Sequence, residues 1–193
     1  MDAQEQILKH AGQYISLTSE EKEYFFSLLQ SKTYYRKEYL QREGNNCNSF
    51  TFIIKGCVKS YLLDEKGEEH ILTIASADWW VVDYMSFVFD HPGSLFIEAI
   101  ENTSTLILTK EKREELFKKI PAFNQYFRII TERAFAVSQQ RVTDILSLPA
   151  TERYDKFLER YKGIADSLTQ QQIASFIGVT PAFFSRMLKA RRR

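Results

Sequence analysis

The residues with the clearest chemical potential lie in the stretch TQQQIASFIGVTPAFFSRMLKARRR, which runs from Thr169 to Arg193. Arginine can donate two parallel hydrogen bonds to O6 and N7 of guanine in the major groove of DNA. Helical spacing would turn Phe184 and Met187 toward a core and Arg186 toward solvent. The basic residues that follow would bind phosphates and make affinity depend on salt; they are Lys189, Arg191, Arg192 and Arg193. The stretch therefore indicates DNA binding.

Two short helices joined by a tight turn would position this arginine. Thr169 is a suitable cap for the first helix, and Gly178 ends it because glycine adopts the left-handed conformation at low cost. Thr180 caps the second helix, and Pro181 suits its first position. The small Ala174 allows the helices to cross closely, so the pattern favours a helix-turn-helix over an ordinary helical hairpin. Beside the arginine, the second helix would expose Ala182, Phe183 and Ser185.

Short strands precede this helical end. Apolar runs separated by Gly-containing turns predict strands at residues 50–54, 58–63, 70–75, 95–100 and 105–108. Over residues 32–109 they predict a small antiparallel barrel or jelly roll, while helical spacing covers the first 31 residues and returns from residue 110. The expected fold is α+β, with a barrel domain at 1–120, a long helix at 121–148 and an all-α DNA-binding domain at 149–193.

The long helix predicts a dimer. Residues 121–148 contain no glycine and no internal proline, and they would span about 40 Å at 1.5 Å per residue. Apolar residues recur along it at alternating spacings of four and three, as in a coiled coil; they are Phe123, Phe127, Ile130, Ala134 and Val137. Packing of this seam on the chain's own barrel is the alternative. Because the helix is longer than a small barrel can cover, we expect part of it to pair in a homodimer.

Charge is divided unevenly along the chain. Residues 1–150 hold 17 Lys and Arg against 21 Asp and Glu, whereas residues 151–193 hold nine against four. A basic C-terminal piece on a mildly acidic body agrees with binding of nucleic acid. No apolar run is long enough for a membrane span and the N-terminus lacks a signal peptide, so a cytoplasmic protein without a membrane partner is expected.

Residues that could catalyse a reaction or bind a metal are scattered. A metal site in a barrel needs two or three histidines with an acid, but His10, His70 and His91 are far apart in the sequence. Cys47 and Cys57 form neither a disulfide framework nor a zinc motif. No nucleophile motif or phosphate loop stands out. We therefore expect no metal, no catalytic residues and no enzymatic activity.

The order of barrel, long helix, SLPATERY and TQQQIASFIGVTPAFFSRML resembles the Crp/Fnr family of bacterial transcription regulators. The resemblance implies a cyclic-nucleotide-binding-type β-roll that senses or transmits a signal, a dimerisation helix and a winged helix-turn-helix. It implies double-stranded DNA with two-fold symmetry and a second copy of the chain as partners, with RNA polymerase as a further candidate. The sequence stops at Arg193, so the wing is expected to be short or absent.

The resemblance also assigns roles at the helix-turn-helix. The family's base-reading positions correspond to Thr180, Ala182, Phe183 and Arg186, and its backbone-contacting positions to Thr169 and Gln171. Members with well-studied sites carry polar or charged residues where this chain has Pro181 and Ala182, so a different target sequence is expected. The alternative interpretation is a β-roll that binds an effector or a protein, with a degenerate helix-turn-helix that does not read DNA.

The effector expected from the resemblance is not cAMP. Cyclic-nucleotide-binding members hold the ribose with Gly-Glu and the phosphate with Arg-Ser or Arg-Thr. Here Val82-Asp83 and Gly93-Ser94 stand at those places, so the cation that pairs with a buried phosphate is missing. The four cysteines of iron–sulfur members are absent too, and no cofactor is expected. Nearby aromatic residues complete a candidate effector pocket, with core packing as the alternative: Trp79, Trp80, Asp83, Tyr84, Phe87, Gly93 and Ser94.

Overall fold

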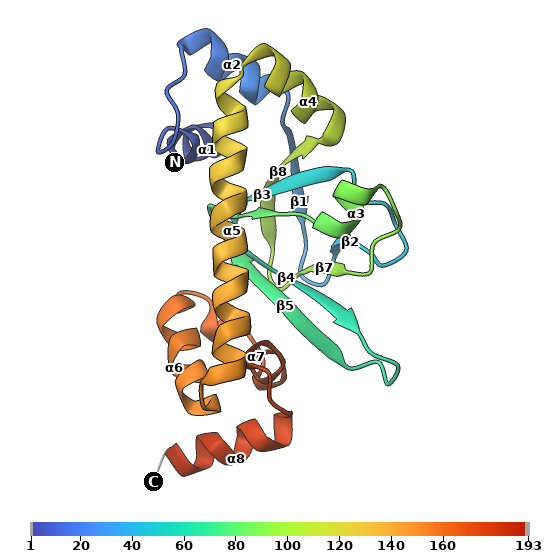
Figure 1. Cartoon of the computed structure of the whole chain (residues 1–193), viewed down its shortest axis with the longest axis vertical. Helices are drawn as coiled ribbons and strands as arrows, with labels where there is room; N and C mark the ends of the chain where they lie inside the picture. Colours follow the sequence, from blue (N-terminus) through green and yellow to red (C-terminus); the bar gives the residue numbers. More distant parts are fainter. Residues whose placement is uncertain (1, 192–193) are drawn as a thin grey trace.

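The middle of the chain is an antiparallel β-roll in the computed structural model, which describes residues 2–191 (Figure 1). Within these residues the strands form two four-stranded sheets, ordered β1-β8-β3-β6 and β2-β7-β4-β5. Their bounds are β1 Gln30–Tyr34, β2 Tyr39–Gln41, β3 Ser49–Lys55, β4 Cys57–Leu63, β5 Glu69–Ser76, β6 Trp80–Val81, β7 Phe96–Ala99 and β8 Thr103–Thr109. All pairings are antiparallel, which confirms the predicted roll with flanking helices.

Aromatic and aliphatic side chains from β3 and β8 form the main core. Phe50 pairs with Leu108 and Phe52 with Leu106 across the two strands, so all four side chains leave the same face of the sheet. Helices α1 (Ala3–Ala11) and α2 (Ser19–Ser27) pack against this face, together with α4 (Lys110–Lys119). A capping box formed by Thr18 and Glu21 starts α2.

Gly56 joins β3 to β4 in a turn that only glycine fits. Its φ is +99°, and a Cβ there would lie 2.5 Å from Thr103 Oγ1 and 2.6 Å from the carbonyl oxygen of Asn102. Thr103 is the first residue of β8 and Asn102 precedes it, so the absence of a side chain at Gly56 allows the start of β8 to pack directly against the turn.

Several elements differ from the sequence-based expectation. The first 31 residues are not wholly helical, since α2 ends at Ser27 and β1 begins at Gln30. β1 was missed because four of its five residues are exposed and show no alternation. β2 and β6 have three and two residues, which is too short to leave a pattern. The short helix α3 (Tyr84–Phe89) was also missed; it begins where Asp83 accepts a hydrogen bond from the backbone of Ser86.

The long helix α5 (Ala122–Ser147) runs past the whole roll, with its first half against the core (Figure 1). Phe123 is fully buried and Phe127 is 5% exposed, both inside the roll's own core. The predicted dimer seam is therefore wrong at these two positions, because the roll occupies that face of the helix. Ile130 also packs against the core, and Ala134 and Val137 line a cavity. Within residues 2–191, no helix is both long and apolar enough to cross a membrane.

The C-terminal domain contains α6 (Ala150–Arg160), a 3₁₀ turn (Ala165–Ser167), α7 (Gln170–Ile177) and α8 (Pro181–Arg191). Its core is continuous with one face of β4 and β5: Tyr61 and Ile71 share a cluster with Phe157, Phe176 and Phe184. Val58, on the opposite face of β4, belongs to a separate cluster inside the roll. The C-terminal domain thus packs on the outside of the roll below α1 and α2 (Figure 1).

Candidate nucleic-acid interface

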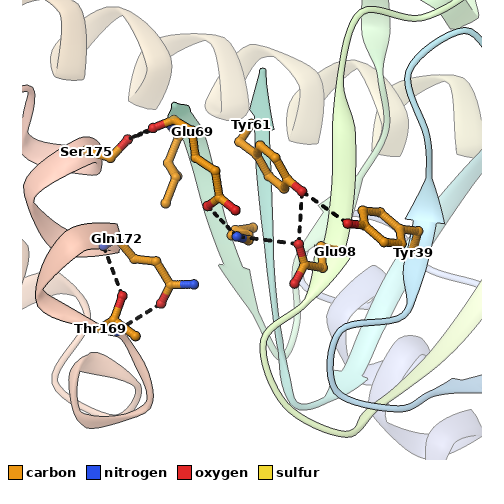
Figure 2. A network of polar contacts seen from close by, with 9 residues as sticks. Tyr39, Tyr61, Glu69, Glu98, Thr169, Gln172 and Ser175 are labelled. Carbon is orange, nitrogen blue, oxygen red and sulfur yellow. Dashed lines mark hydrogen bonds and ion pairs between the residues drawn. The ribbon is translucent and has the colours of Figure 1, made fainter. Parts of the chain in front are cut away.

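Local chemistry forms α7 and its turn as the sequence predicts. Thr169 Oγ1 accepts a hydrogen bond from the backbone N–H of Gln172 at 3.2 Å, and Gln172 Oε1 accepts one from the N–H of Thr169 at 2.9 Å (Figure 2). Gly178 ends the helix with φ +74°. Ala174 is fully buried, so α8 can cross close to α7. The Thr169 cap, the left-handed glycine and the small crossing residue are confirmed, and the reciprocal bond from Gln172 adds a capping box.

Helix α8 presents one face to solvent and packs the other against the domain. Thr180 Oγ1 accepts a hydrogen bond from the N–H of Phe183 at 3.2 Å, which caps the helix start. Phe184 and Met187 are buried. Four predicted contact residues are exposed on the opposite side, with Ser185 half-buried beside them: Ala182, Phe183, Arg186 and Lys189. At 3.6 residues per turn the four exposed residues share one side of α8.

The basic side chains of α8 differ in whether they form ion pairs with acidic residues. Among the ion pairs of the described residues, none involves Arg186 or Lys189, so both charges remain available. Arg191 instead pairs with Asp155 of α6 at 2.5 Å and lies over the ring of Tyr154. Thr169 and Gln171 are exposed at the start of α7. Arg192 and Arg193 lie outside the described residues.

Hydrogen bonds to the roll hold α7 at a defined place. Ser175 Oγ donates a hydrogen bond to the carbonyl of Glu69 at 2.6 Å (Figure 2). It also accepts one from the N–H of Ile71 at 2.9 Å. Arg141 of α5 donates to the carbonyls of Ile71 and Phe176, each at 2.8 Å. β5 is the last strand of its sheet, so these contacts use backbone groups that lack a further strand. The sequence carries one weak signal, a serine between buried apolar residues of α7.

A buried charge network lies on β4, β5 and β7 next to this contact. Lys59 is almost fully buried and pairs with Glu69 and, at 3.4 Å, with Glu98. Tyr61 donates its hydroxyl to Glu98 at 3.0 Å (Figure 2). Burial raises the pKa of Tyr61 well above its ordinary value, so its hydroxyl keeps its proton and remains a donor. Glu69 therefore connects the network to α7: its carboxylate pairs with Lys59, and its backbone carbonyl accepts a hydrogen bond from Ser175.

The predicted effector-pocket residues are not all together. Trp79, Trp80 and Tyr84 line a cavity of about 370 Å³ between the roll, α5 and the C-terminal domain. Asp83 is fully buried and caps α3, and Phe87 belongs to the main core. Gly93 packs against Asp83, since a Cβ at Gly93 would lie 2.5 Å from Oδ2; Ser94 is exposed. The predicted pocket is therefore wrong at Asp83, Phe87 and Gly93, which serve the local fold, and at Ser94, which does not line the cavity.

Comparison with known proteins agrees with this architecture. Residues 31–120 match the cyclic nucleotide-binding domain family. The anaerobic regulatory protein of Haemophilus influenzae is 24% identical over 170 residues, which cover 82% of this chain and 65% of that protein. The chain thus spans just under two thirds of the length of that relative. A transcriptional regulator of the Crp/Fnr family from Eubacterium rectale has a TM-score of 0.73 at 17% identity, over 91% of this chain and 84% of that one.

The matched residues belong to the cyclic nucleotide-binding domain family, and the fold of the whole chain is that of the Crp/Fnr regulators to which it is similar. A second solved structure with a similar fold is that of the regulator CLP of Xanthomonas campestris, with a TM-score of 0.73 at 14% identity, over 91% of this chain and 92% of that chain. In this chain the matched domain is the roll from β1 to α4, and α5 connects it to the helix-turn-helix. The three similar proteins named above are regulators rather than enzymes.

Proposed function

We propose that this chain is a non-enzymatic transcription regulator of the Crp/Fnr type, which reads double-stranded DNA through α8. One observation carries the proposal: Arg186 and Lys189 project from the exposed side of a capped helix whose other side is buried at Phe184 and Met187. A helix-turn-helix places such a face in the major groove. Arg186 would bind guanine, and Lys189 would bind a phosphate.

We propose that the reading unit is a homodimer formed through the exposed side of α5. Phe135, Val142 and Leu146 are large apolar residues at spacings of seven and four, and they are 67%, 53% and 81% exposed. An isologous pairing of this stripe would bury it against its copy. It replaces the predicted seam, which lies about a third of a turn away around the helix. Two recognition helices about 34 Å apart would then contact successive turns of a symmetric site.

We further propose that the roll does not bind cAMP in the manner usual for the family and responds to a different signal. Asp83 stands where the family holds a ribose, but it is buried and its carboxylate caps α3. Ser94 and Gly93 offer no cation for a phosphate. The roll would therefore serve as a sensing domain with a different ligand.

Selection of binding sites from a random DNA pool, followed by titration of Arg186→Ala, tests the proposal. We expect a two-fold symmetric site and a loss of about 1–3 kcal/mol of sequence discrimination in the variant. Arg128→Ala is the matched control, because Arg128 is an exposed arginine of α5 paired with Glu132. Binding that ignores salt and is unchanged by Arg186→Ala would contradict the proposal and favour a β-roll binding module whose helix-turn-helix does not read DNA.

The dimer has a separate test. Phe135→Asp with Val142→Asp places charges in the proposed stripe without touching the roll core. We expect sedimentation to show a dimer for the parent chain and a monomer for the variant at micromolar concentration. A monomeric parent chain, or a variant that remains dimeric, would refute the stripe as the interface.

A further inference from the structure

The cavity beside the tryptophans has walls from three parts of the molecule. Leu72 and Trp79 come from the roll, Val137 from α5, and Phe176 and Ile177 from the end of α7. Its volume of about 370 Å³ falls within the roughly 300–1,000 Å³ typical of small-molecule sites. Of the positions that correspond to the family's ribose and phosphate contacts, Val82 lines the cavity, whereas Asp83 and Gly93-Ser94 do not. The cavity thus adjoins the nucleotide position and extends from it along α5 to α6 and α7.

Positive charge predominates around this apolar space. The lining contains four cationic side chains, Arg141, Arg153, Lys156 and Arg160, and one acid, Asp144. Lys156 pairs with Asp144 at 2.8 Å, which leaves an excess of positive charge. Such an excess beside apolar walls attracts an anion, and the low polarity of the surroundings strengthens the attraction.

Two of these cations are already committed to backbone carbonyls. Arg141 donates to Ile71 and Phe176, and Arg153 donates to the carbonyls of Ile177 and Leu148. These bonds orient the two guanidinium groups. Because the acceptors are neutral carbonyls, the positive charges are not neutralised. Burial lowers the pKa of Arg141, because its charge is partly withdrawn from water.

Arg160 is the cation free to meet a ligand. It is exposed at the end of α6, and among the described residues no ion pair or hydrogen bond to an acid involves it. Its guanidinium carbon lies 5.7 Å from the centre of the Tyr161 ring. A guanidinium group at the edge of an apolar cavity suits a carboxylate, which can accept two parallel hydrogen bonds.

We propose that this cavity binds a small amphipathic anion, with its apolar chain or ring against Trp79, Val137 and Phe176 and its carboxylate toward Arg160. This inference deepens the proposed function by naming the ligand class of the sensing domain. Phe176 and Ile177 are the last two residues of α7, so the ligand would contact the first helix of the helix-turn-helix directly. Occupancy would therefore favour one setting of that helix on the roll.

Intrinsic fluorescence reports occupancy, because Trp79 and Trp80 are the two tryptophans of the chain and both line the cavity. The purified full chain is titrated with decanoate, decanamide and decylamine, which share a chain length and differ in charge. We expect decanoate to change the emission at the lowest concentration, decanamide at a higher one and decylamine at the highest. Equal binding of decanoate and decanamide would overturn the ligand class, and unchanged emission with all three would overturn the site.

A matched pair of variants places the binding at Arg160. Arg160→Gln should weaken decanoate binding about fivefold and leave decanamide binding unchanged. Lys162→Gln removes the same charge two residues away, outside the lining, and should change neither. Decanoate binding that survives Arg160→Gln unchanged would refute the proposed site. The titration contains no DNA, so its failure leaves DNA reading by Arg186 untouched, and failure of DNA reading leaves the ligand result valid.

Discussion

Replacing Arg141 with methionine should loosen the C-terminal domain from the roll. Arg141 lies on α5 and donates three hydrogen bonds to two carbonyls, those of Ile71 on β5 and Phe176 on α7, at 2.8 to 3.2 Å. Its guanidinium also lies 4.6 Å from the ring centre of Phe176. One side chain thus joins the long helix, the end strand of a sheet and the first helix of the helix-turn-helix.

The expected size of the effect follows from these contacts. A hydrogen bond with a charged donor contributes about 1.5–3 kcal/mol, and two carbonyl acceptors would lose theirs. Arg141 is half-buried, so water replaces part of each bond. We expect Arg141→Met to lower the free energy of unfolding by about 2–4 kcal/mol. Arg141→Lys keeps the charge but not the planar fork, and it should recover less than half of the loss.

Urea denaturation followed by far-UV circular dichroism measures this loss. Arg128→Met is the control, because Arg128 is an exposed residue of the same helix whose ion pair with Glu132 contributes under about 0.5 kcal/mol. Hydrogen exchange at the N–H of Ile71, which Ser175 accepts, should also become faster in Arg141→Met. A loss no larger than that of Arg128→Met would refute the role assigned to Arg141.

Three further outcomes are expected. Gly178→Ala should cost about 1–2 kcal/mol in urea denaturation, because φ is +74° while the nearest atom to a new Cβ would be 3.7 Å away; an unchanged stability would show that the left-handed turn is not required. Lys59→Met should lower the free energy of unfolding by about 2–4 kcal/mol, discounted for the partial exposure of Glu69, because two carboxylates lose their shared cation. Adding Glu69→Gln and Glu98→Gln should restore most of this stability, and no restoration would contradict the pairing. Burial lowers the pKa of His10 from 6.5, so the unfolded chain binds its proton first and stability should fall as pH drops below about 6.5; His10→Gln should remove this component, and an identical pH profile in the variant would contradict it.

The parts of the fold predicted from sequence are those whose cause is local. Thr169, Gly178 and Thr180 act on neighbours within a few residues, so their caps and turn could be recognised from residue type and spacing. The longer strands from β3 to β5 are apolar runs that are separated by glycine turns. β1, β2 and β6 are exposed or very short, and they become strands because neighbouring strands pair with them.

The seam on α5 shows the limit of periodicity. Spacings of four and three identify a face of a helix but not the surface that covers it. The roll covers the face with Phe123 and Phe127, and the exposed stripe is the one with Phe135 and Leu146. Likewise, Asp83 matched a family position in the sequence, but in three dimensions its carboxylate caps α3.

Residue types and short-range spacing were sufficient to identify the roll, the helix-turn-helix and the outward Arg186, because caps, turns and helix faces depend on contacts within a few residues. Tertiary packing alone decided the rest: which side of α5 is buried, where Ser175 and Arg141 hold α7, and that Trp79 and Arg160 border one cavity. Ser175 and Ile71 are 104 positions apart, and a contact over that separation leaves no periodic trace in one sequence.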